Sequence, residues 1–339
     1  MTGVSGTGPW PGLDVLDAQS TVVGDLADVP EGVQGLPFVT TLPARGAAAA
    51  PLARTAGMLE DLPVELGVHG WKLADRPGRD LARVQALLRE DLDALAVAAH
   101  GYDGPLVVPV LGPLSLAATL YLARGDRVLA DVGAVRDLAE SLAVGLVEHV
   151  AAVRRAVPGA SVRVLVHEPQ LAAVLAGVLP TFSGYASLRA VPGPVAGERL
   201  GVVVDALHGA GVTQVAVHAG SSWTPIAAVR AAGADALALA VAGFDERAWE
   251  RLAETVEGGV RLWAQLPAQA SSSCAGPDVT GQADVLTVPW RRVGLPASDL
   301  AEVVLLAGDP PPGASPDGAR GTLAGLVRTA LLVAERAEA

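Results

Sequence analysis

The sequence predicts an α/β protein built as one parallel TIM-type (β/α)8 barrel. Short apolar runs alternate with helix-like segments of ten residues or more, and polar residues follow several of the apolar runs directly. The run Leu106–Leu111, which ends at Gly112-Pro113, is typical of a buried strand with a sharp exit. Because parallel neighbours need a crossover connection, this alternation favours a parallel sheet with helices outside it.

The helices are predicted from apolar residues at helical spacing and from their start and stop signals. Leu81, Val84, Leu88 and Leu92 recur on one face, and Gly101 ends that segment. Asp245 is placed to cap a later helix that ends at a Gly pair. We expect helices at residues 14–26, 52–62, 79–100, 132–157, 198–210, 225–232, 245–258 and 316–337.

Six strands are predicted plainly, and two more are expected near Val4 and near either Trp71 or Val285. A doubly wound open sheet is the main alternative, but its Gly-rich phosphate turn is missing, since Gly6-Thr7-Gly8 is followed by Pro-Trp-Pro rather than by a helix. The six strands are expected at residues 106–111, 162–166, 214–217, 236–241, 261–266 and 303–306.

Length and composition fit a single large domain. The chain has 339 residues, of which 51% are hydrophobic, and α/β barrels reach this size as one unit. We expect one barrel domain over residues 1–339, with residues 40–52, which are rich in Ala, as a flexible loop.

Charge and cysteine content narrow the possible partners. A net charge of −12 would repel phosphate backbones and anionic lipids, so neither nucleic acid nor a membrane is expected as a partner. The single cysteine, Cys274, excludes an internal disulfide and a zinc site with two thiolates from one chain. With no secretory signal visible, a cytoplasmic protein that binds a small molecule is expected; the oligomeric state is left open.

The barrel mouth is where the functional groups are expected, because parallel barrels carry their sites at the carboxyl ends of the strands. His167 and Glu168 end one predicted strand, and His218 ends the next. Neighbouring strand residues face opposite sides, so at most one of His167 and Glu168 should enter the mouth. We interpret His218 either as a functional residue, namely a metal ligand or a hydrogen-bond donor to a bound anion, or as a histidine that hydrogen bonds to the backbone.

Other residues near strand ends are weaker candidates for ligand binding. Trp10 and Ser221 follow strand ends. Asp309 stands before three prolines, where its carboxylate would accept a hydrogen bond from a ligand amine or cap the turn. Tryptophans in so aromatic-poor a chain are more often core anchors than pocket walls. Cys274 is expected to be a buried or idle thiol. Four other histidines are interpreted as surface residues without visible partners: His69, His100, His149 and His208.

In their order, the strand ends resemble those of the cobalamin-independent methionine synthase family and, more loosely, uroporphyrinogen decarboxylase. The resemblance covers nearly the whole chain and implies a barrel of that superfamily, in a short form like actinobacterial proteins labelled methionine synthase. It rests on the segments Gly8–Asp14, Val110–Pro113, His167–Pro169, Val217–Gly220 and Gly313–Pro316, which look like the family's Gly-Ser-Phe-Pro turn, Gly-Pro loop, Asp-Glu-Pro, His-x-Cys and the region after its last Cys-Gly.

The resemblance also predicts what is missing. The family holds zinc through His, Cys, Glu and Cys, and of these only His218 matches; the other positions fall on Gly220, near Ala240 and near Asp309. The serine and aspartate that grip homocysteine fall on Pro9 and His167. A stable zinc site needs three or four protein ligands.

Two functions follow from this interpretation. The first is a methionine-synthase-like barrel that lacks the zinc and homocysteine site, carries no cofactor and binds a small ligand at its mouth. The alternative is an active S-methyltransferase that moves a methyl group from a folate or corrinoid donor to homocysteine and uses zinc. Fold alone does not decide between them.

Overall fold

Eight parallel strands form one sheet in the computed structural model, which describes residues 1–267 and 278–338. Cys274 lies outside the described residues. The strand order is β2-β1-β10-β9-β8-β7-β6-β5, and every pairing is parallel. The strands are β1 (Thr2–Gly6), β2 (Val33–Gly35), β5 (Pro105–Leu111), β6 (Ser161–His167), β7 (Gln214–His218), β8 (Ala236–Ala240), β9 (Arg261–Gln265) and β10 (Val304–Ala307).

The two edge strands meet through a short parallel bridge. Phe38, just beyond β2, pairs with Val107 of β5, and the Val39 amide donates to the Val107 carbonyl at 2.9 Å. The Val107 amide in turn donates to the Pro37 carbonyl at 2.8 Å. The sheet therefore curls round on itself, and the predicted TIM-type (β/α)8 fold is confirmed.

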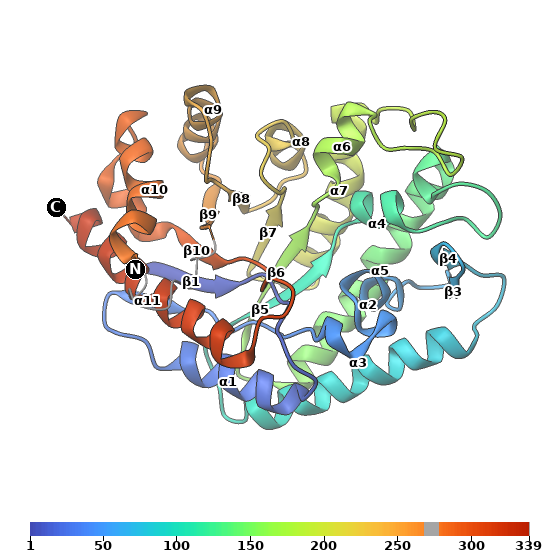
Figure 1. Cartoon of the computed structure of the whole chain (residues 1–339), viewed down its shortest axis with the longest axis horizontal. Coiled ribbons are helices and arrows are strands. Elements are labelled where there is room, and N and C mark those ends of the chain that lie inside the picture. The colour runs from blue at the N-terminus through green and yellow to red at the C-terminus, as the bar shows by residue number, and fades with distance from the viewer. Residues whose placement is uncertain (268–277, 339) are drawn as a thin grey trace.

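Helices surround the strands, as Figure 1 shows. Aspartates begin several of them: the Asp14 carboxylate accepts from Leu16 N and Asp17 N, and Asp131 and Asp245 cap later helices in the same way. The helices are α1 (Val15–Ala27), α2 (Pro51–Ala56), α3 (Arg79–Ala98), α4 (Pro113–Thr119), α5 (Val132–Ala156), α6 (Leu171–Ala176), α7 (Gly193–Gly209), α8 (Ile226–Ala231), α9 (Glu246–Glu257), α10 (Val279–Arg292) and α11 (Pro316–Glu338).

The eighth strand is not where the sequence predicts it. The expected strand near Val4 is β1, but Trp71 lies in β4 (Gly70–Leu73), which forms a two-stranded antiparallel sheet with β3 (Val64–Gly67) outside the barrel. Val285 lies in helix α10. The missing strand is β2, which has only three residues, Val-Gln-Gly, and therefore carries no apolar run. Its Gly35 has no room for a side chain, because a Cβ would meet the backbone of Leu26 in α1.

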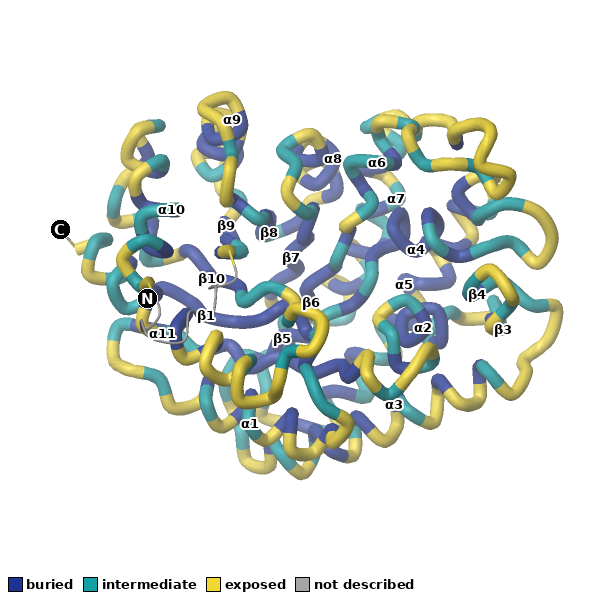
Figure 2. Tube along the Cα trace, viewed as in Figure 1, coloured by how far each residue is buried: buried dark blue, intermediate teal, exposed yellow. Residues whose placement is uncertain are grey.

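Residues 40–52, expected as a loop, contain two 3-10 turns, η1 (Pro43–Arg45) and η2 (Ala47–Ala49), and the start of α2. The core lies where apolar strands meet apolar helix faces, and Figure 2 shows the buried strands inside and the exposed residues on the outer loops and helices. Among the described residues no helix combines the length and the hydropathy needed to span a bilayer.

Candidate functional site

A cavity of about 450 Å³ opens at the carboxyl ends of the strands. One wall comes from the ends of β1, β6, β7, β9 and β10, and the other from β5, α2 and α5. Its hydrocarbon surface is supplied mainly by prolines, valines, Leu111 and Met58. The polar residues that line it are Thr7, Thr41, Arg54, Thr55, His149, His167, His218, Gln265 and Asp309.

Two histidines from adjacent strands stand next to each other in this cavity. His167 ends β6 and His218 ends β7, and the parallel register pairs their Cα atoms directly. His167 Nε2 donates to the Thr7 carbonyl at 2.8 Å, and His218 Nε2 donates to Gln265 Oε1 at 2.7 Å. Since both partners are acceptors, each ring carries its proton on Nε2, which leaves Nδ1 as the acceptor of the neutral ring.

Both rings are neutral at physiological pH. Burial, together with the neighbouring His218, lowers the pKa of His167 to about 3. Burial also lowers the pKa of His218, and its hydrogen bond to Gln265 and the charge of Asp309 act in the opposite direction. The pair therefore offers hydrogen-bond acceptors rather than positive charge to a molecule in the cavity.

Asp309 brings a negative charge to the same wall. Thr7 Oγ1 donates to Asp309 Oδ1 at 2.6 Å, and the Thr7 carbonyl accepts the hydrogen bond from His167. Thr7 therefore links the His167 ring and the Asp309 carboxylate through one residue. Among the described residues Asp309 forms no ion pair, so its charge is available to a ligand.

The opposite wall carries a buried cation. Arg54 of α2 is 5% exposed and pairs through Nη1 with Asp91 of α3. His149 of α5 lies near it, and burial together with the Arg54 charge lowers the pKa of His149 to about 4. The Thr41 hydroxyl is buried and finds no partner among the described residues, which marks it as a group that a ligand could satisfy.

Three of the predicted site residues meet in the cavity: His167, His218 and Asp309. Glu168 faces away, as the alternation along a strand requires. It is fully buried, and its carboxylate accepts from the amides of Leu114 at 2.9 Å and Ser115 at 2.6 Å at the start of α4. Burial raises its pKa to about 7, although these hydrogen bonds act against the rise.

The other two candidates lie outside this cavity. Trp10 is 5% exposed, packs against Phe38 with ring centroids 6.3 Å apart and lines a neighbouring cavity. Ser221 is exposed in the loop after β7 and lines neither of these cavities.

Two of the four histidines interpreted as surface residues without partners differ from that interpretation. His149 lines the cavity from α5, whereas His208 lies on the surface as expected but hydrogen bonds to Asp235 at 2.8 Å. Of the residues that the sequence interpretation missed, Thr7 and Gln265 stand at strand ends, so the rule that found His218 also applies to them. Arg54 and His149 come from helices, where no strand-end signal exists.

The described residues do not fit a tetrahedral zinc site. Residues 1–267 and 278–338 contain no group of three or more His, Cys, Asp or Glu side chains that could hold a metal ion. Of the four positions expected from the resemblance, His218 and Asp309 carry ligand atoms, whereas Gly220 and Ala240 have none in their side chains. His218 itself is bonded to an amide oxygen of Gln265.

The comparisons with known proteins show the fold. The chain is similar to a B12-independent methionine synthase from Shewanella sp. W3-18-1, solved in complex with selenomethionine, with a TM-score of 0.60 and 13% identity over 98% of this chain and 97% of that one. A GH113 beta-1,4-mannanase matches with a TM-score of 0.41 and 10% identity over 91% of this chain and 87% of that one, too distant to carry an argument. No protein-family model matches, and no curated protein sequence does.

Proposed function

We propose that this protein is a methionine-synthase-like barrel that binds a small organic ligand at its mouth without zinc. The observation that carries the proposal is the partner of His218: its Nε2 hydrogen bonds to Gln265, and no set of three metal-ligand side chains surrounds it in the described part of the chain. A zinc ion would need that nitrogen, or Nδ1 of the same ring, together with at least two other donors.

The cavity supports binding of a polar ligand. It combines a carboxylate on one wall with a guanidinium on the other, and neutral imidazoles stand on both. Its volume of about 450 Å³ falls within the range of sites for small organic molecules. Five of its polar residues stand at or just beyond the ends of β1, β6, β7, β9 and β10, a placement typical of binding sites in parallel barrels.

The second candidate is an S-methyltransferase that uses homocysteine, and one observation favours it. The likeness to the Shewanella methionine synthase spans nearly the whole of both chains, and that protein was solved with selenomethionine. Its weakness is chemical, because a thiol with a pKa near 8.5 stays mostly protonated at neutral pH without a Lewis acid or a base. The neutral His167 and His218 rings, with lowered pKa values, are weak bases for that proton.

Metal analysis of the purified full chain separates the two. We expect far less than one zinc per chain and no homocysteine-dependent methyl transfer from folate or corrinoid donors. His208→Ala serves as the control for His218→Ala, because His208 is a surface histidine paired with Asp235. Stoichiometric zinc that His218→Ala or Cys274→Ser removes and His208→Ala retains would overturn the zinc-free proposal.

Ligand binding is tested separately with a library of polar fragments. The reporters are the imidazole carbon–proton signals of His167 and His218, assigned with His167→Gln and His218→Gln. We expect some fragments to shift these signals saturably while the His208 signals stay fixed. If no fragment does so, the proposal that the mouth is a binding site is wrong.

A further inference from the structure

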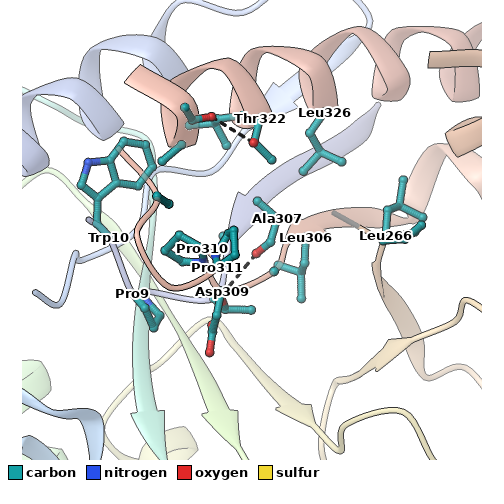
Figure 3. A pocket seen from close by; sticks show the side chains of 18 of the residues that line it. Pro9, Trp10, Leu266, Leu306, Ala307, Asp309, Pro310, Pro311, Thr322 and Leu326 are labelled. Atoms are coloured by element: carbon teal, nitrogen blue, oxygen red, sulfur yellow. Dashed lines mark hydrogen bonds between the residues drawn. The ribbon is translucent and has the colours of Figure 1, made fainter. Parts of the chain in front are cut away.

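A second cavity, of about 230 Å³, adjoins the site on the side of α11. It lies between the ends of β1 and β10 and the amino-terminal half of α11. Figure 3 shows Thr322 and Leu326 of the helix facing Leu306 and Ala307 across it, with Asp309 at its far edge. The two cavities share three lining residues, Thr7, Pro9 and Asp309, so one molecule can reach into both.

The second cavity presents a hydrocarbon surface. Trp10 and Phe38 form its aromatic side, and prolines and leucines supply most of the rest. Its polar side chains already have partners within the protein: Gln282 donates to the Pro267 carbonyl at 2.9 Å and accepts from Thr329 at 3.1 Å.

The hydroxyls of this cavity are occupied in the same way. Thr322 donates to the Gly318 carbonyl at 3.0 Å, and Ser315 accepts from the Gly318 amide at 3.1 Å. A ligand group that enters therefore meets carbon atoms and satisfied polar groups, which favours an apolar group. A cavity of about 150 Å³ already holds a benzene ring, so this one has room for a substituted ring.

Asp309 stands where the apolar cavity joins the polar one. Thr7 holds its Oδ1, and no lysine or arginine among the described residues neutralises the carboxylate. The nearby His218 ring is neutral at physiological pH and offers an acceptor rather than a charge. This junction favours a cationic donor and disfavours an anion.

We infer that the site takes an amine bearing an aromatic or branched aliphatic group, with the ammonium on Asp309 and the apolar group between Trp10 and α11. The inference rests on the proposed function, because it names the ligand class for the same barrel mouth. The apolar cavity sets which side group is accepted, and Asp309 sets the sign of the charge beside it.

Isothermal titration calorimetry of the full chain near neutral pH tests this with three probes. Phenethylamine carries both features, phenylacetate reverses the charge and ethylamine lacks the ring. We expect saturable binding of phenethylamine, and binding at least about tenfold weaker for each of the other two. Equal binding of phenylacetate would overturn the assignment of Asp309, and equal binding of ethylamine would overturn that of the cavity.

Two pairs of variants locate the contacts. Asp309→Asn should weaken phenethylamine binding about tenfold, whereas Asp317→Asn removes the same charge from the exposed start of α11 and should leave the affinity unchanged. Ala319→Phe fills the apolar cavity and should abolish binding. Ala324→Phe makes the same change at an exposed position of the same helix and should have no effect.

These outcomes are distinguishable from failure of the proposed function. If wild-type protein binds no phenethylamine while polar fragments still shift the His167 and His218 signals, the amine assignment is wrong and the zinc-free binding site stands. If the protein holds stoichiometric zinc at His218, the proposed function fails whatever the amines do.

Discussion

The imidazole rings of His167 and His218 lie side by side at the ends of adjacent strands, with centroids 5.3 Å apart and planes inclined by 56°. Each donates from Nε2 to a fixed acceptor, Thr7 or Gln265. Two protonated rings this close would repel each other, so at most one could carry a charge, and burial lowers the pKa of both. The wall is therefore polar without being cationic, and Asp309 remains its charged group.

The buried histidines should make the protein less stable in acid. Burial lowers the pKa of His149 to about 4 and that of His167 to about 3, whereas both are near 6.5 in the unfolded chain. Between these values the unfolded state binds more protons, so the free energy of unfolding falls as the pH falls below about 6.5. Each histidine should remove about 2 kcal/mol between about pH 7.5 and about pH 5.

The check is urea unfolding of His149→Gln and wild type at both pH values. The variant should lose about 2 kcal/mol less than wild type over this interval, whatever its stability at about pH 7.5. His100→Gln replaces an exposed histidine and serves as the control, with the pH dependence of wild type expected. Equal losses for His149→Gln and wild type would contradict the lowered pKa of His149.

Glu168 should have the opposite effect on the pH dependence of the free energy of unfolding. Burial raises its pKa to about 7, well above the value near 4.3 of an unfolded chain. The native state therefore binds more protons in this interval, and the carboxyl stabilises the fold as the pH falls. We expect Glu168→Gln to lose about 2 kcal/mol more than wild type between about pH 7.5 and about pH 5 in the same urea measurement. A shallower pH dependence than wild type would contradict the raised pKa.

Substitutions at Gly112 and Glu168 should have non-additive effects on the free energy of unfolding, because the two residues are in close contact. A Cβ at Gly112 would run into the Glu168 carboxylate, which is fixed by the amides of Leu114 and Ser115. Gly112→Ala should therefore destabilise the wild-type protein by about 1–3 kcal/mol. In a Glu168→Ala background, which removes the obstructing group, the same change should cost much less. Urea unfolding of the four proteins in a double-mutant cycle measures the coupling, and additive effects would contradict it.

Much of the barrel could be predicted because its signals are local. The run before Gly112-Pro113 is apolar on both faces, and the run that ends at His167 is apolar except for Arg163, as expected for strands buried under helices. β2 was not predicted because it has only three residues and depends on tertiary contacts. Its Gly35, for example, packs directly on the backbone of Leu26. Such a strand exists through tertiary contact and leaves little trace in the sequence.

The part of the site at the strand ends could be predicted from the sequence, and the part on the helices could not. The alternation along β6 predicts that only one of His167 and Glu168 enters the mouth, and the structure shows that it is His167. The wall formed by Arg54 and His149 joins positions 95 residues apart on two helices, a contact that no local pattern encodes. Helix periodicity alone assigns His149 to a surface, because it cannot show that this face borders a cavity.

The buried ion pair beneath the site leads to the last prediction. Asp91 of α3 is 4% exposed and accepts from two cations, Arg54 of α2 and Arg45 of η1, the latter at 2.7 Å. Asp91→Asn would leave the Arg54 guanidinium without a counter-charge in a place from which water is excluded, whereas Arg45 would keep its pair with Glu90 at 2.6 Å. Because removing one partner of a buried pair is strongly destabilising, we expect a loss of about 3–5 kcal/mol in the free energy of unfolding.

Asp137→Asn is the matched control, because it removes the same charge from an aspartate whose pair with Arg136 is exposed on α5. Exposed pairs contribute little, so this change should cost less than about 1 kcal/mol. If the loss comes from the unpaired Arg54 cation, Asp91→Asn combined with Arg54→Met should recover part of it, since the second change removes that cation. Urea unfolding of the three variants measures these free energies. Equal losses for the two single variants, or no recovery of stability in the double variant, would contradict a buried charge network under the ligand cavity.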